Sequence, residues 1–193
     1  MLRIGALISG RGSNLQAVLD ACKDKRITGE IKVVISNKAA AFGLERARQA
    51  GIEALHLTSE NQIITALKEK KIDLVILAGF MKIISPKFIA EFRNKILNIH
   101  PALLPAFPGL HAQQQAIAYG AKVSGATVHF VDEGMDTGPV ILQEAVPVQE
   151  TDTADTLAGR IIKVEHQLYP RAIQLFAEGR LKIEGRKVII KEK

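Results

Sequence analysis

An asparagine and a histidine lie two residues apart in the segment Asn98-Ile-His-Pro101. If the segment is a β-strand, both side chains point to the same face, because side chains alternate along a strand. An amide N–H can stabilise a developing oxyanion, and a histidine can add a second hydrogen bond or transfer a proton. Asn98 and His100 are therefore candidate catalytic residues. The alternative is a polar strand end whose histidine binds the backbone.

A carboxylate beside this histidine would complete a group that handles protons, and Asp136 is the candidate. It lies in a glycine-containing loop between two apolar runs, from Asp132 to Pro139. A neighbouring carboxylate raises the pKa of an imidazole and orients the ring. The spacing does not show that Asp136 meets His100, so an ordinary turn aspartate stays open as the alternative.

A glycine-rich turn, Ser9-Gly-Arg-Gly-Ser-Asn14, separates the first apolar run from a helical pattern. Glycines let the backbone turn tightly and expose its N–H groups, and a helix that begins there adds positive potential. Such a turn can bind phosphate, and Gly12, Ser13 and Asn14 would be its groups. A dinucleotide-binding turn requires glycine where this chain has Leu15, and no P-loop lysine follows. A plain strand-to-helix turn is the alternative.

The other histidines and the cysteine give no metal-binding pattern. His111, His129 and His166 are scattered and lack the His-Glu-x-x-His spacing of a zinc helix, so we expect them to be structural or exposed. Cys22 has no second cysteine for a disulfide or a thiolate metal site. We therefore expect no metal, and a lone cysteine suits a reducing cytoplasm.

The segments that position these residues alternate between buried strands and amphipathic helices. Apolar runs in the first half predict strands at Leu2–Ile8, Ile31–Ser36, Glu53–Leu57 and Asp73–Ala78. Between them, apolar residues recur at helical spacing. This β-α-β order predicts an α/β fold that is doubly wound around a mostly parallel sheet, with a Rossmann-like N-terminal half.

The pattern changes in the second half. Three closely spaced prolines exclude helix and central strand over residues 101–109. The elements that we expect around this segment are a short helix at Pro86–Phe92, a strand at Ile96–His100, a helix at Ala112–Tyr119, strands at Val123–Val131 and Val140–Val148, a long helix from Thr153, and a hairpin at Leu181–Ile190. No repeat or linker is visible, so residues 1–193 are expected to form one domain.

The composition is that of an ordinary globular protein, with 47% hydrophobic and 24% charged residues. The net charge of +6 could indicate nucleic-acid binding, but much of the excess lies near the C-terminus. Tryptophan is absent, and no aromatic and basic residues are interleaved to stack on bases. We expect a solvated basic surface and an anionic small-molecule substrate. The apolar N-terminus reads as a buried strand and not a signal peptide, and no run could span a membrane.

Taken together, these segments resemble the phosphoribosylglycinamide formyltransferases, a family of folate-dependent enzymes of purine synthesis. The resemblance covers almost the whole chain, and the matching segments are Ile8–Gln16, Leu77–Met81, Asn98–Pro101, Leu103–Pro105, Pro108–His111, Asp136–Pro139 and Glu165–His166. The Asn-x-His-Pro element with the later aspartate is specific to folate formyltransferases and related hydrolases. The Gly-Ser-Asn turn narrows the resemblance to the formyltransferases that act on a ribonucleotide.

The resemblance implies a formyltransferase fold and direct formyl transfer from the cosubstrate 10-formyltetrahydrofolate to the amine of N1-(5-phospho-D-ribosyl)glycinamide. Asn98, His100 and Asp136 match the catalytic residues of the family. The residues that match its ribonucleotide site are Gly12, Ser13, Asn14, Pro101, Gly109 and Glu165, the last near the amine. Those that match its folate site are Met81, Lys82, Ile83, Ile84, Asn98 and Val131. The N-terminal half would bind phosphate and the C-terminal half folate.

The chain departs from the family at several positions. Ala102 replaces a serine of many relatives, so one hydrogen bond to the active-site turn is expected to be missing, and Thr137 replaces a glycine. The stretch Leu57–Asp73 is shorter than in relatives where it carries an arginine near the glutamate tail of folate, and Lys82 is the candidate substitute. We also expect a cis Leu104–Pro105 bond, because cis prolines belong to tight, fixed turns.

Three alternatives stay open. A formyl-folate hydrolase shares the site but would not need the phosphate turn, and it usually has an N-terminal regulatory domain. Methionyl-tRNA formyltransferase needs a further C-terminal domain, for which this chain is too short. A basic nucleic-acid-binding module would bind RNA or DNA with a steep salt dependence. We expect a cytoplasmic monomer or homodimer whose partners are two small-molecule substrates, and not nucleic acid or a membrane.

Overall fold

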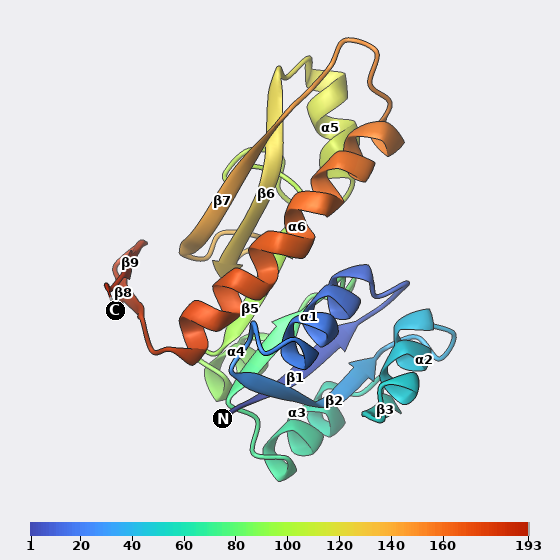
Figure 1. Cartoon of the computed structure of the whole chain (residues 1–193), viewed down its shortest axis with the longest axis vertical. Helices are drawn as coiled ribbons and strands as arrows, with labels where there is room; N and C mark the ends of the chain where they lie inside the picture. The colour runs from blue at the N-terminus through green and yellow to red at the C-terminus, as the bar shows by residue number, and fades with distance from the viewer. Residues whose placement is uncertain (193) are drawn as a thin grey trace.

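A computed structural model of the chain describes residues 1–192. Within this range the strands form one nine-stranded sheet in the order β3-β2-β1-β4-β5-β6-β7-β9-β8. The strands are β1 (Leu2–Ile8), β2 (Gly29–Ser36), β3 (Glu53–His56), β4 (Leu74–Leu77), β5 (Ile96–His100), β6 (Val123–Phe130), β7 (Val140–Pro147), β8 (Leu181–Glu184) and β9 (Lys187–Ile190). Figure 1 shows the two long strands β6 and β7 extending beyond the parallel part of the sheet.

The first five strands are parallel and form the N-terminal half of the sheet. β1 lies inside it and is buried on both faces, since Ile4 and Ala6 pack in one core cluster and Leu7 in the other. The strand order reverses beside β1, which has β2 on one side and β4 on the other. Open α/β sheets bind ligands at the carboxyl ends of strands at such a reversal. The predicted doubly wound fold with a Rossmann-like N-terminal half is confirmed.

Helices cover both faces of the sheet. They are α1 (Ser13–Lys23), α2 (Phe42–Gln49), α3 (Glu60–Glu69), α4 (Pro86–Glu91), α5 (Ala112–Tyr119) and α6 (Ala154–Ala177). Most buried apolar residues of α1, α2, α5 and α6 join one core cluster, and those of α3 and α4 join the other. The long α6 begins at a capping box in which Thr153 and Thr156 exchange hydrogen bonds, and it runs along the sheet beside α1 (Figure 1). The first and last long helices therefore pack together.

The antiparallel half of the sheet begins where β5 pairs with β6. Asn98 lies opposite His129, and His100 lies opposite Thr127. Directly opposed side chains on one face of an antiparallel pair lie close enough to interact. This register therefore selects the neighbours of both candidate catalytic residues.

The proline-rich segment after β5 is anchored by a buried threonine. The Leu104–Pro105 bond is cis, as predicted. Thr127 Oγ1 donates to the Ala102 carbonyl at 2.6 Å and accepts the Leu104 N–H at 3.0 Å. Gln143 Nε2 donates to the Leu104 carbonyl at 2.7 Å. These backbone contacts hold the turn, and none of them depends on the side chain at position 102.

Over residues 1–192, no helix combines the length and the apolar character needed to cross a lipid bilayer.

Candidate active site

Asn98, His100 and Asp136 lie together at the carboxyl end of β5. His100 Nδ1 is 3.3 Å from Asp136 Oδ2, and Asn98 Nδ2 is 3.4 Å from Asp136 Oδ1. Asn98 and His100 come from alternate positions of one strand and so share a face, as predicted. Asp136 comes from the loop between β6 and β7, and one of its carboxylate oxygens faces each of these two side chains. The sequence spacing of Asp136 and His100 did not by itself predict this contact.

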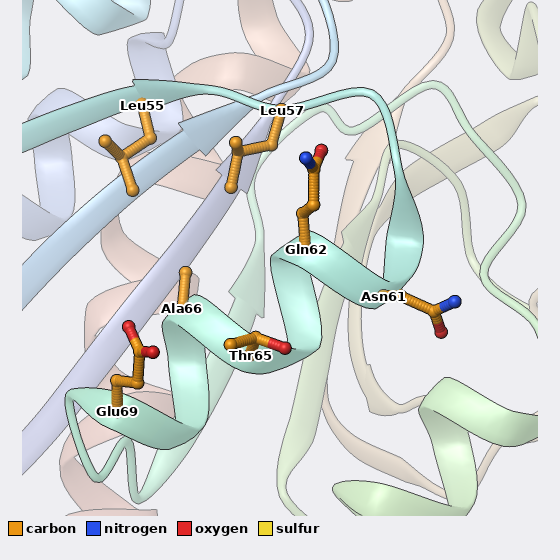
Figure 2. Close-up of a pocket in the computed structure, with 7 residues that line it drawn as sticks. All are labelled: Leu55, Leu57, Asn61, Gln62, Thr65, Ala66 and Glu69. Carbon is orange, nitrogen blue, oxygen red and sulfur yellow. The ribbon is translucent and has the colours of Figure 1, made fainter.

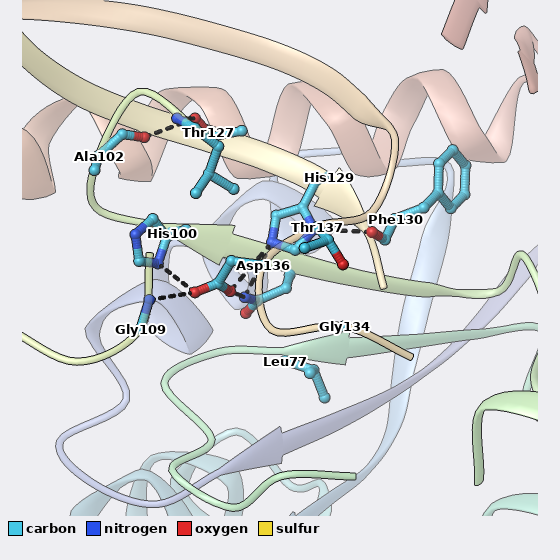
Figure 3. A network of polar contacts seen from close by, with 12 residues as sticks. Leu77, His100, Ala102, Gly109, Thr127, His129, Phe130, Gly134, Asp136 and Thr137 are labelled. Atoms are coloured by element: carbon cyan, nitrogen blue, oxygen red, sulfur yellow. Dashed lines mark hydrogen bonds and ion pairs between the residues drawn. The ribbon is translucent and has the colours of Figure 1, made fainter. Parts of the chain in front are cut away.

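Polar groups surround the Asp136 carboxylate. The Gly109 N–H donates to Oδ2 at 2.8 Å, and His129 Nε2 lies 3.7 Å from Oδ1 (Figure 3). Burial alone would raise the pKa of Asp136, but the His129 ring, the Gly109 N–H and the charge of His100 together hold this pKa below its usual value. Asp136 is therefore a carboxylate at neutral pH, and it ties the proline segment to β5.

His100 is almost fully buried, and both of its ring nitrogens face acceptors. Nε2 lies 2.8 Å from the Phe107 carbonyl, and Nδ1 faces Asp136. Burial lowers the pKa of His100. The Asp136 carboxylate and the Phe107 carbonyl raise it, but by less, so the pKa stays below its ordinary value. The net direction is opposite to the one expected from the carboxylate alone. The protonated ring can nevertheless donate to both acceptors at once. His100 is therefore placed to take up a second proton when an anionic oxygen forms beside it.

His129 belongs to the same group and is buried, so of the two expectations for it, structural or exposed, the structure excludes exposure. Its Nδ1 lies 2.8 Å from the Phe130 carbonyl, which requires a hydrogen on Nδ1. When the ring is neutral, Nε2 accepts from Asn98 Nδ2 at 3.3 Å, and when Nε2 carries a hydrogen it faces Asp136 Oδ1 at 3.7 Å. His129 thus orients the amide of Asn98. The signal was the antiparallel register of two predicted strands, which sets His129 opposite Asn98.

The loops around this group contain left-handed backbone at residues other than glycine. Phe107, His111 and Asp136 have φ values of 54°, 58° and 54°. Such conformations are uncommon for these residue types and cluster at functional sites. Gly109, at φ 79°, lies between two of them. These left-handed residues lie in the loops that present the Phe107 carbonyl, the Gly109 N–H and the Asp136 carboxylate to the site.

The predicted phosphate turn begins α1. Gly12 is the N-cap, with φ 71° and ψ 36°, and no side chain caps the helix. A Cβ on Gly12 would lie 2.9 Å from the Gly43 Cα, so the turn also packs tightly on α2. The first N–H groups of a helix have no partners within that helix and carry positive potential. Gly12 and Ser13 therefore present a geometry that suits an anion.

A cavity of about 330 Å³ opens beside this turn. Its lining residues are Ser13, Gln16, Ala17, Asp20, Arg26, Arg46 and His166. Arg46 bridges from α2, donating to the Arg11 carbonyl at 2.9 Å and to Gln16 Oε1 at 3.0 Å. His166 Nε2 is buried without a hydrogen-bond partner. Neither Arg46 nor His166 was predicted to bind a ligand, yet they supply cationic and donor groups next to the turn.

Asn14 and Glu165 connect the turn to the last helix. Asn14 Nδ2 donates to Glu165 Oε2 at 2.9 Å. Burial raises the pKa of Glu165, and the bond from Asn14 offsets part of that rise. One turn later on α6, the Tyr169 hydroxyl lies 2.9 Å from the carbonyls of both Leu77 and Leu97, the latter next to Asn98. One helix, α6, therefore contacts the phosphate turn through Glu165 and the strand of the catalytic group through Tyr169.

The predicted folate wall lies in the segment after β4. Met81 and Ile83 are 65% and 79% exposed, which is high for apolar side chains. Ile84 and Val131 are partly buried against the same core cluster, so they lie on one side of the sheet. Lys82 is exposed, and its Nζ donates to the Thr58 carbonyl at 3.0 Å. Pro101 follows His100 directly and is half-buried.

A second cavity, of about 350 Å³, lies between β3 and α3 (Figure 2). Its lining residues are Leu55, Leu57, Asn61, Gln62, Thr65, Ala66 and Glu69. Three strands separate β3 from β5 in the sheet order β3-β2-β1-β4-β5. Glu69 is its one ionisable lining residue, so this cavity carries no acid–base pair comparable with the one at Asp136. Within residues 1–192, no group of His, Cys, Asp and Glu side chains is arranged to hold a metal ion.

The fold and the polar group at the end of β5 can be compared with known proteins. The sequence model of the family described as formyl transferase matches residues 2–173. The chain therefore belongs to the formyl transferase family. Phosphoribosylglycinamide formyltransferase of Escherichia coli (strain K12) is 48% identical over 191 residues, which cover 94% of this chain and 90% of that protein.

Two further relatives agree with this assignment. Glycinamide ribonucleotide transformylase 1 from Symbiobacterium toebii has a crystal structure that matches with a TM-score of 0.97 and 55% identity, over 100% of this chain and 95% of that one. The trifunctional purine biosynthetic protein adenosine-3 of Homo sapiens is 46% identical over 190 residues. That match covers 94% of this chain but 19% of the much longer human protein.

Proposed function

We propose that this chain is a phosphoribosylglycinamide formyltransferase of purine biosynthesis. It transfers the formyl group of 10-formyltetrahydrofolate to the amine of N1-(5-phospho-D-ribosyl)glycinamide. The observation that supports the proposal is that α6 contacts both parts of the site: Glu165 binds Asn14 of the helix-start anion turn, and Tyr169 binds the Leu97 carbonyl beside Asn98 of the Asn98–His100–Asp136 group. A ribonucleotide held by its phosphate at Gly12 and Ser13 could extend past Glu165 and present its amine to a formyl group near Asn98.

The chemical step is a direct transfer through a tetrahedral intermediate. The amine nitrogen attacks the formyl carbon on N10 of the folate, and the carbonyl oxygen becomes an oxyanion. Asn98 and His100 donate hydrogen bonds to it. The contacts of Asn98 Nδ2 with its present acceptors are long, 3.3 and 3.4 Å, so an anionic oxygen can compete for its hydrogens. Losing one such donor costs about a hundredfold to a thousandfold in rate.

Asp136 supports the proton movements of this step. The amine loses a proton as the new C–N bond forms, and N10 gains one as the old C–N bond breaks. Asp136 holds His100 through Nδ1 and stabilises the imidazolium, which leaves Nε2–H for the oxyanion in competition with the Phe107 carbonyl. The proton can pass from the amine to N10 through this group or through water, and the step requires no metal.

The substrates are proposed to divide between the two halves of a single domain. Gly12, Ser13 and Asn14 bind the phosphate together with Arg46 and His166 of the adjoining cavity. Glu165 accepts hydrogen bonds from the amine, which favours its ionised form. Pro101 and Gly109 line the ribonucleotide, and the residues that line the folate are Met81, Lys82, Ile83, Ile84, Asn98 and Val131. We place the enzyme in the cytoplasm, as a monomer or homodimer with small-molecule partners only.

A spectrophotometric assay tests this function. Purified protein is incubated with 10-formyltetrahydrofolate, with and without the ribonucleotide, and tetrahydrofolate release is followed. Release that requires the ribonucleotide supports the transferase. Equal release without it would indicate a formyl-folate hydrolase, and no release in either sample would refute the proposed chemistry.

A further inference from the structure

Ser9 lies where the two proposed substrate-binding segments meet. It follows β1 and is the first residue of the phosphate turn, yet it is only 5% exposed. Its backbone N–H donates to the Gly79 carbonyl at 3.1 Å, and its Oγ accepts the Met81 N–H at 2.8 Å. Gly79 and Met81 belong to the segment that carries the proposed folate wall. One buried residue therefore connects the end of β1 to this wall.

The direction of these hydrogen bonds is set by Asn37. Ser9 Oγ lies 2.6 Å from Asn37 Oδ1, which can only accept, so the single hydroxyl hydrogen is donated there. A lone pair of Oγ is then left for the Met81 N–H. Asn37 follows β2, and the three residues thus connect the carboxyl ends of β2, β1 and β4. The hydroxyl is consequently a fixed acceptor, because it cannot rotate freely.

The segment from Gly79 to Ser85 is held at its two ends. At the far end, the Ser85 N–H donates to Glu60 Oε2 at 3.0 Å. At the near end, Ser9 supplies both of the contacts described above. Between them, Met81 and Ile83 project outward with little cover. The Ser9 hydroxyl is thus one of the two near-end contacts that set the position of this wall relative to the phosphate turn, and the Lys82–Thr58 bond is a further contact along the segment.

We propose that Ser9 is a positioning residue that holds the folate wall in register with the phosphate turn. The inference rests on the proposed function, in which the two substrates react directly. Direct transfer requires the amine and the formyl carbon to meet within a small distance, and displacements of about 1 Å can cost about a hundredfold in rate. Ser9 touches neither substrate and acts through the Met81 backbone.

Ser9→Ala removes the acceptor and leaves the Met81 N–H without its partner. We expect the KM for 10-formyltetrahydrofolate to rise about tenfold, in line with the loss of one buried hydrogen bond. The kcat should fall as well, because the bound substrates are no longer in register. The KM for the ribonucleotide should change less, since the N–H groups of Gly12 and Ser13 remain. A general loss of stability would not separate the two KM values in this way.

Ser36→Ala is the matched control. Ser36 is also a buried serine at the end of a strand, but its hydroxyl contacts only Lys38, as donor to the carbonyl at 2.9 Å and as acceptor from the N–H at 3.0 Å. It reaches neither binding segment. Asn37→Ala is a second variant, half-buried and so less disruptive, which removes only the group that orients the Ser9 hydroxyl. It should change the folate KM in the same direction and by less.

The experiment measures both KM values, kcat, tetrahydrofolate binding by fluorescence, and unfolding by urea for the wild type and the three variants. Selective loss of folate affinity in Ser9→Ala and Asn37→Ala, at a stability matching Ser36→Ala, is the expected result. Equal kinetic effects in Ser9→Ala and Ser36→Ala, or unchanged folate affinity in Ser9→Ala, would overturn the inference. A wild type that binds tetrahydrofolate but shows no ribonucleotide-dependent turnover would instead refute the proposed function, and the binding data would still test Ser9.

Discussion

Asn14 and Glu165 lie 151 residues apart in the sequence, and Asn14 Nδ2 donates to Glu165 Oε2 at 2.9 Å. This bond joins the first turn of α1 to the middle of α6, and so connects the beginning of the fold to its last long helix. It also brings the phosphate turn next to a buried carboxyl group. The relationship defines how a substrate with a phosphate at one end and an amine at the other could be oriented.

Glu165→Gln should stabilise the fold and weaken substrate binding. The amide keeps an acceptor for Asn14 but cannot ionise, so it avoids the cost of the buried charge that Glu165 carries above its raised pKa. Above that pKa the variant should unfold at a higher urea concentration than the wild type, while its KM for the ribonucleotide rises because the charge that attracts the amine is lost. A variant that is less stable and binds the ribonucleotide normally would contradict this role.

The same residue predicts a dependence of stability on pH. Burial raises the pKa of Glu165 above its ordinary value of 4.5, so the folded chain binds more protons than the unfolded chain between that value and the raised one. The contribution of Glu165 to stability therefore falls as pH rises through this window. Urea unfolding of the wild type and Glu165→Gln from pH 4.5 upward should show a difference that grows with pH and then levels off.

Asp136→Asn should slow turnover while leaving folate binding nearly intact. The amide cannot stabilise the imidazolium of His100, so kcat should fall by about a hundredfold to ten-thousandfold, the value of general acid–base assistance. Glu133→Gln, an exposed change in the same loop, is the control for a loss of negative charge. If Asp136→Asn weakened folate binding as much as it lowered kcat, a binding role would replace the catalytic one.

His129→Ala should impair catalysis through Asn98. It removes the acceptor of the Asn98 amide, so the amide can rotate away from the orientation that the reaction uses. We expect kcat to fall by about tenfold, corresponding to one lost hydrogen bond, and Asn98→Ala to cost more. A double mutant of both residues should then be no worse than Asn98→Ala. Additive losses would show that His129 acts independently of Asn98.

Gly12→Ala should destabilise the protein by more than the strain of a left-handed alanine, because the added Cβ also crowds α2. A left-handed alanine costs about 1–2 kcal/mol, and here its Cβ would also lie 2.9 Å from the Gly43 Cα. Gly120→Ala is the matched control, because Gly120 has φ 77° and open space where a Cβ would lie. Gly12→Ala should lose more stability and show a higher ribonucleotide KM. Equal stability losses in the two variants would mean that the approach to Gly43 is unimportant.

The sequence predicted the order of strands and helices because most strands in the first half are strongly apolar runs and most helices have apolar residues at helical spacing. It also placed Asn98 and His100 on one face, since that follows from strand geometry. It could not place Asp136 beside them, because the path of the Asp132–Pro139 loop is decided by tertiary contacts such as the Gly109 N–H. Only the resemblance to a known family supplied that expectation.

His129, Arg46 and His166 were missed for a similar reason. Each is a single polar residue in an ordinary-looking segment, and its role depends on which strand or helix packs beside it. The pKa of His100 is lowered and not raised as a neighbouring carboxylate would predict, because the effect of burial outweighs that of Asp136. Burial is a property of the folded chain that local sequence does not reveal.

The most direct test of the central claim is a single-turnover experiment with 10-formyltetrahydrofolate labelled in the formyl carbon. Enzyme in excess is mixed with this folate and the ribonucleotide, quenched in acid, and the label is located. Transfer through the Asn98–His100–Asp136 group predicts that the label passes to the ribonucleotide as tetrahydrofolate forms, and that Asp136→Asn slows both together. Label recovered as formate, or undiminished transfer by Asp136→Asn, would contradict the account.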